Sequence, residues 1–69
     1  MSRLSLPEQE QTVVSLVAEG VRDEEIGSRL GISPAEVRRA VSSACDRLGA
    51  TDRLDLVILA IHFGIITLL

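Results

Sequence analysis

Apolar residues recur every three or four positions in four stretches of the chain, with Gly, Ser or Asp near their ends. These stretches cover about residues 6–19, 23–30, 34–48 and 52–65. The spacing is the period of an α-helix, and no stretch shows the period of two that predicts a half-buried strand. The pattern therefore predicts an all-α fold of four helices, in one domain that spans residues 1–69.

The third stretch has the sharpest start. Ser33–Glu36 offers an N-cap residue, a proline at the first helical position and a glutamate three residues after the cap, which together form a capping box. The apolar side of this helix holds Val37, Val41, Ala44 and Leu48. The polar side carries Arg38, Arg39, Ser42 and Arg47. Because a Gly31-Ile32 turn separates this helix from a shorter one, the layout is that of a helix-turn-helix.

Local signals also mark the ends of the first two helices. Ser5–Glu8 predicts a capping box at the first helix, while Gly20 and Gly31 predict left-handed residues after the first and second. Asp23–Glu25 occupies the first turn of the second helix, where the helix dipole favours carboxylates. Gly27 either lets another backbone approach closely or only weakens the helix.

The fourth helix is apolar on nearly every side, and Thr51 or Asp52 is expected to cap it. A helix of this kind is normally buried all round. A 69-residue monomer cannot cover it, so we expect its outer side to meet another chain. The residues expected at this dimer interface are Val57, Ile58, Ile61 and Ile65. The run of residues 56–69 lacks Asp, Glu, Lys and Arg but is too short to span a bilayer, so no membrane partner is expected.

The charge of the chain is unevenly distributed. Its net value is −3, which opposes binding to the phosphates of nucleic acid. Residues 8–25 hold six carboxylates and one arginine, whereas residues 34–53 hold four arginines and three carboxylates. The third helix is thus mildly basic while the front of the chain is acidic. All the basic residues are arginine, the better bidentate donor to guanine or phosphate, although this usage can equally reflect genomic composition.

The few residues with reactive side chains exclude several classes of function. Cys45 is the only cysteine, so neither an internal disulfide nor a cysteine metal site is expected, and we expect an intracellular, cytoplasmic location. His62 has no second His or Cys at metal-binding spacing. The sequence contains no catalytic triad pattern, glycine-rich phosphate loop or carboxylate pair in an apolar setting. It therefore predicts no enzyme activity, no cofactor and no bound metal.

Two segments carry a resemblance to a known family. Leu30-x-Ile32-Ser33-x-x-x-Val37 is shared by many helix-turn-helix proteins, whereas Arg47–Leu56 followed by an apolar fourth helix is more specific. With these residues the chain resembles the DNA-binding domain of LuxR/NarL/FixJ-type transcription regulators over nearly its whole length. Region 4 of bacterial sigma factors is the nearest rival, through Leu6–Gln9 and Gly31–Pro34. That region usually stops after its reading helix, so the fourth helix favours the LuxR-type resemblance.

The resemblance implies that the third helix enters the major groove and that the fourth often forms a dimer contact. Carried over by position, it implies base reading by Arg38, Arg39 and Ser42, and contact with the DNA backbone by Arg47. It also implies backbone contacts at Glu36, Ala40 and around Glu24. This chain departs from the family at those three positions. The family often has Thr where Glu36 stands, His or another polar residue where Ala40 stands, and Lys where Glu24 stands. Two of the departures place carboxylates where phosphates would approach.

Three functions are compatible with this picture. The leading hypothesis is a dimeric, DNA-binding transcription regulator, either a short stand-alone member or a fragment of a longer protein. The alternative is an interaction module that has lost DNA binding, in which Arg38 and Arg39 are only solvated surface residues. Such a module would pair as a heterodimer with a related regulator and antagonise it. A third hypothesis is a sigma-like piece that contacts RNA polymerase.

Overall fold

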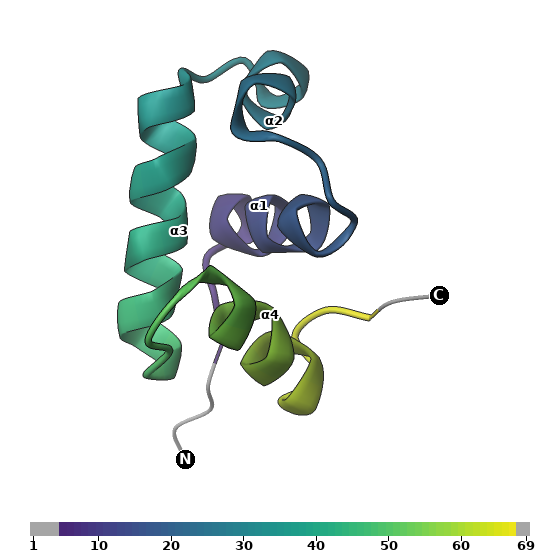
Figure 1. The fold of residues 1–69 in the computed structure, drawn as a ribbon, viewed down its shortest axis with the longest axis vertical. Helices are drawn as coiled ribbons and strands as arrows, with labels where there is room; N and C mark the ends of the chain where they lie inside the picture. The colour runs from purple at the N-terminus through teal and green to yellow at the C-terminus, as the bar shows by residue number, and fades with distance from the viewer. Residues whose placement is uncertain (1–4, 68–69) are drawn as a thin grey trace.

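The computed structural model describes residues 5–67, and within this range it contains four α-helices and no strand. The helices are α1 (Glu8–Ala18), α2 (Asp23–Leu30), α3 (Pro34–Leu48) and α4 (Arg53–His62). Helix α3 runs along one side of the molecule, and α2, α1 and α4 are arranged beside it, each in contact with it (Figure 1). The predicted all-α class is confirmed.

All four helices contribute to one hydrophobic core, which also takes in Leu6 and Ile66 from outside the helices. The fully buried side chains are Val13 and Val14 of α1, Ile26 of α2, Val37 and Ala44 of α3, and Leu56 and Ala60 of α4. On α3 the buried positions recur every three or four residues, so one side of the helix packs inward while the other faces solvent.

Helices α2 and α3 have the predicted bounds, but α1 does not. It begins at Glu8, after Pro7 in an extended conformation, and no side chain caps it. The prediction that Ser5 caps a helix starting near residue 6 is therefore wrong. Leu6 is buried in the core although it lies before the start of α1.

Helix α4 ends at His62, three residues before the predicted position. Gly64 has a φ of +72°, and the N–H groups of Ile65 and Ile66 both point back to the carbonyl oxygen of Ala60, at 2.9 and 3.3 Å. This turn buries Ile66 and lets the Gln11 side-chain amide donate to the Ile65 carbonyl oxygen. The helix ends early because the chain folds back onto the core.

The turn between α2 and α3 depends on a close backbone approach at Gly27. A Cβ atom at this position would lie 2.5 Å from the Ile32 carbonyl oxygen, so the expected close approach is confirmed. The N–H of Ile32 donates to the Gly27 carbonyl oxygen, and Gly31 takes the predicted left-handed conformation. These contacts fix α2 against the start of α3.

A search of the described helices for one with the length and hydropathy of a bilayer-spanning segment finds none.

Candidate nucleic-acid interface

The start of α3 is held by a complete capping box. The N–H of Glu36 donates to Ser33 Oγ at 3.1 Å, and the N–H of Ser33 donates to Glu36 Oε1 at 3.0 Å. These bonds with Ser33 hold the pKa of the Glu36 carboxyl below its ordinary value, and the nearby Arg39 charge adds to the effect. The first turn of α3 is thus rigid and carries an ionised carboxylate at neutral pH.

The predicted DNA-contacting side chains all lie on the exposed side of α3. Arg38, Arg39, Ser42 and Arg47 are exposed, whereas Val37 and Ala44 on the opposite side are fully buried. Between residues 5 and 67, neither Arg38 nor Arg39 takes part in an ion pair. Both guanidinium groups therefore face solvent, and neither is ion-paired with Glu36 in this range.

Arg47 lies beside the carboxylate of Glu10, for which the sequence pattern predicts no contact. Its Nε is 3.3 Å from Glu10 Oε1, and Ser43 Oγ donates to Glu10 Oε2 at 2.9 Å. The Glu10 side chain is only 14% exposed, and its Oε1 accepts no well-aligned hydrogen bond within the described part of the chain. Glu10 thus joins α1 to α3 and holds Arg47 near it. Because the partners are more than thirty residues apart, no local pattern could have revealed this contact.

A shallow groove of about 270 Å³ runs between the start of α1 and the exposed side of α3. It is lined by Gln9, Glu10, Glu36, Arg39, Ala40 and Ser43. An arginine and two carboxylates therefore share this groove, which has both hydrogen-bond donors and acceptors.

Asp23 lies in the first turn of α2, where the helix dipole favours a carboxylate, and it also forms an ion pair. Arg53, the first residue of α4, donates to both of its carboxylate oxygens, at 2.8 and 3.1 Å. This hydrogen bonding lowers the pKa of Asp23, and the charges of Arg53 and Arg38 contribute further. The pair joins the starts of α2 and α4, so it connects the helix-turn-helix to the last helix.

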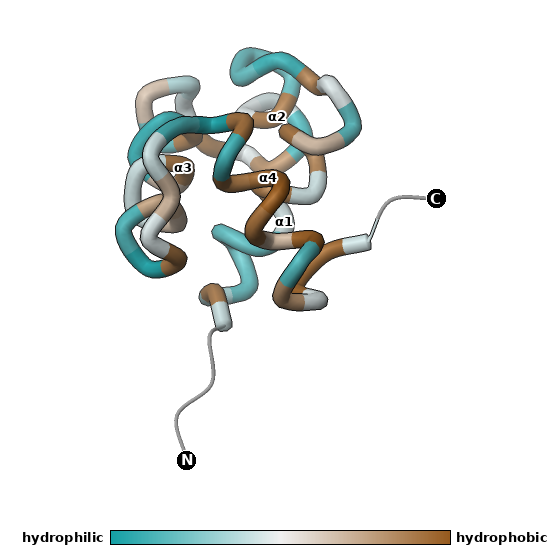
Figure 2. Tube along the Cα trace, turned by 60° about the horizontal axis from the view of Figure 1, so that its bottom comes forward, coloured by the Kyte–Doolittle hydropathy of each residue, from teal (hydrophilic) through white to brown (hydrophobic). Residues whose placement is uncertain are grey.

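Helix α4 presents a large apolar surface to solvent. Of the two predicted caps, Asp52 is the N-cap residue, since its Oδ1 accepts the N–H of Asp55 at 2.8 Å. Leu54 is 70% exposed and Ile58 55%, and Ile61 and Phe63 are also exposed. Figure 2 shows α4 as a largely apolar segment, in brown. This helix is therefore not buried all round by its own chain.

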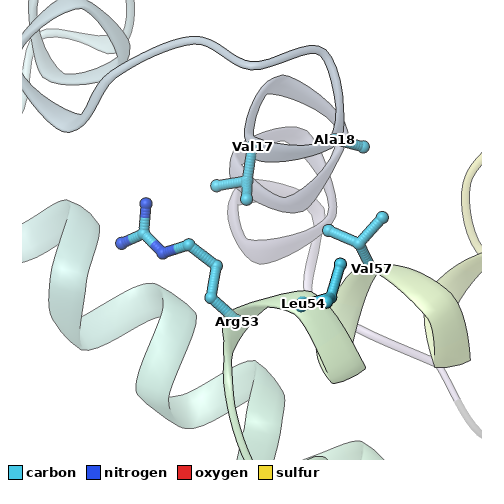
Figure 3. A pocket seen from close by; sticks show the side chains of 5 residues that line it. All are labelled: Val17, Ala18, Arg53, Leu54 and Val57. Carbon is cyan, nitrogen blue, oxygen red and sulfur yellow. The ribbon is translucent and has the colours of Figure 1, made fainter.

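The four residues predicted at the dimer interface differ in exposure. Ile58 and Ile61 are exposed, whereas Val57 and Ile65 are partly buried, the latter beyond the end of α4. A hollow of about 410 Å³ lies beside this surface. Figure 3 shows Val17 and Ala18 of α1 on one side of it and Leu54 and Val57 of α4 on the other.

The remaining reactive side chains occupy structural positions. Cys45 packs against the core, and burial raises the pKa of its thiol. The exposed His62 ring stands edge-on to Phe63, with ring centroids 5.2 Å apart. Over residues 5–67, no three His, Cys, Asp or Glu side chains come together as a metal site.

Two comparisons place similar sequences beside most of this chain. The family described as bacterial regulatory proteins, luxR family, matches residues 4–60. Transcriptional regulatory protein YdfI of Bacillus subtilis (strain 168) is 33% identical over 63 residues. That alignment covers 91% of this chain but 30% of the relative, so the chain spans less than a third of the relative's length.

Proposed function

We propose that this chain, which belongs to the luxR family of bacterial regulatory proteins, binds double-stranded DNA through α3 and pairs with a second copy through α4. The membership confirms the LuxR-type resemblance, and the family is one of regulatory proteins rather than of enzymes. By analogy with a relative named as a transcriptional regulator, the binding would control transcription in the cytoplasm.

The observation that carries the proposal is the solvent-facing pair Arg38 and Arg39 near the start of α3. In helix-turn-helix proteins the N-terminal part of the second helix reaches the base edges of the major groove. Arginine there donates two hydrogen bonds to guanine O6 and N7. The capping box supports this role because it fixes the turn that positions both side chains.

The exposed surface of α4 supports the pairing of two copies. Leu54, Ile58 and Ile61 recur at helical spacing and remain in solvent in the single chain. Contact between two such surfaces would bury them and relate the two α3 helices by a two-fold axis. Two α3 helices so related would read two half-sites of a palindromic DNA sequence.

The test is binding to mixed-sequence duplex DNA over a range of salt concentrations. We expect a negative slope of log affinity against log salt, because each phosphate contact releases counterions. Arg38→Ala and Arg39→Ala are each expected to weaken binding and to make this slope less negative, because each removes a positive charge beside the DNA. The control is Arg29→Ala, which removes an exposed arginine of α2 that is ion-paired with Glu25 and should change affinity little.

An antagonist that pairs with a related regulator is the second candidate. It is favoured by exposed carboxylates at Glu24 and Glu36, by the engagement of Arg47 with Glu10, and by the net charge of −3. Absent binding at low salt, together with pairing of this chain with another LuxR-type domain, would select this function over DNA binding.

A further inference from the structure

Glu36 is an exposed acidic residue at the start of α3, and its charge opposes DNA binding. It is exposed in the first turn of the helix and lines the same groove as Arg39, three residues further along. A carboxylate facing DNA is repelled by every phosphate, but the capping box uses only one oxygen of Glu36 and leaves the other available to a donor.

The Glu36 carboxylate is fixed in place before any ligand arrives. Its Oε1 accepts the N–H of Ser33, while its Oε2 accepts no hydrogen bond from any other residue in the range 5–67. The lowered pKa keeps the group ionised at neutral pH, so it can only accept hydrogen bonds. A preorganised acceptor loses little conformational entropy when a donor approaches it.

The major groove offers few donors to such an acceptor. Cytosine presents its N4 amino group, whereas guanine and thymine present acceptor oxygens that an ionised carboxylate repels. Adenine presents an amino group beside the N7 acceptor, which suits an amide better than a carboxylate. The best partner for Oε2 is therefore the amino group of cytosine.

We propose that Glu36 is a specificity-determining residue that accepts a hydrogen bond from the exocyclic amino group of cytosine, next to a guanine contacted by Arg39. The inference rests on the proposed DNA-binding function. A carboxylate and a guanidinium in one groove match the donor of cytosine and the acceptors of guanine, while the carboxylate weakens binding to other sequences. Glu36 would therefore lower the affinity for non-specific DNA and raise the ratio of specific to non-specific affinity.

The first experiment selects bound duplexes from a random-sequence pool with three forms of the chain. These are the natural chain, Glu36→Gln and the control Asp46→Asn, which removes an exposed charge from the far part of α3. Glutamine retains the side-chain oxygen that accepts the Ser33 N–H, so the capping box is preserved. We expect a cytosine preference with the natural chain and Asp46→Asn that is lost with Glu36→Gln. The same base preferences for all three forms would overturn the inference.

The second experiment replaces that cytosine by 2-pyrimidinone, which lacks the amino group, in the enriched duplex. We expect the natural chain to bind this duplex about fivefold or more weakly, and Glu36→Gln to bind both duplexes within about twofold. Equal affinity of the natural chain for the two duplexes refutes the cytosine contact, and this measurement does not depend on the stability of the variant.

If the natural chain enriches no sequence and binds no duplex at low salt, the DNA-binding function fails and the inference falls with it. If binding depends on salt and Arg39→Ala weakens it, but replacing the cytosine has no effect, the inference is refuted and the DNA-binding function stands.

Discussion

At the residue scale, Gly27 is a position at which backbone atoms leave no room for a side chain. Backbone atoms of Ile32 and Ser33 surround the place where a side chain would begin, at 2.5 and 3.4 Å from a Cβ atom. We expect Gly27→Val to lower the free energy of unfolding by about 1–3 kcal/mol, because backbone atoms cannot rotate away from the added methyl groups. Urea denaturation followed by circular dichroism measures the change.

Ser28→Val is the matched control for this substitution. Ser28 is the next residue of α2 and is exposed, so the same side chain there should change stability by within about 0.5 kcal/mol. Equal stability of the two variants would show that the turn relaxes around the side chain, and the role assigned to Gly27 would then be wrong.

At the scale of the helices, the Asp23–Arg53 pair makes the junction of α2 and α4 sensitive to pH. The hydrogen bonds from Arg53 lower the pKa of Asp23 in the folded chain below its ordinary value of 3.8. The pair therefore contributes stability above that ordinary value and loses it as pH falls through the lower, folded-state pKa. Arg53 is 43% exposed, so we expect Asp23→Asn to cost only about 0.5–1 kcal/mol at pH 7.

The difference in unfolding free energy between the natural chain and Asp23→Asn should shrink between pH 5 and pH 2 (about the range in which a depressed carboxyl titrates). Arg53→Gln and the double variant separate the ion pair from the interaction of Asp23 with the α2 dipole. An equally large difference at both ends of this range would show that the charge of Asp23 does not stabilise the fold.

The helix boundaries show which features a sequence reveals. The start of α3 and the end of α2 depend on caps within a few residues, and both were predicted correctly. The end of α4 depends on Ile66 reaching the core, and the Glu10–Arg47 contact depends on how α1 crosses α3. Such features follow from packing between distant segments. The exposure of Arg38 and Arg39 was predictable because it follows from helical periodicity alone.

At the scale of the whole molecule, the apolar surface of α4 predicts a dimer. Ile58→Glu with Ile61→Glu places two carboxylates on the exposed side and leaves the buried Leu56 and Ala60 unchanged. We expect this variant to sediment as a folded monomer, because the added charges cannot be desolvated at an apolar contact. Analytical ultracentrifugation and circular dichroism together test association and folding.

Thr12→Glu with Ser28→Glu is the control, since it adds the same charge to exposed positions of α1 and α2. This control should remain dimeric. A natural chain that sediments as a monomer at high concentration, or an α4 variant that still dimerises, would contradict pairing through this helix.

The position of Cys45 makes a disulfide-linked dimer of this chain unfavourable. The thiol packs at the core edge near the Asp52 carbonyl oxygen, and its raised pKa keeps it protonated at neutral pH. A protonated thiol is a poor nucleophile and forms disulfides slowly. Chains kept in air should therefore resist disulfide cross-linking. A dimer seen by size-exclusion chromatography without a reducing agent would then result from contact between surfaces rather than from oxidation.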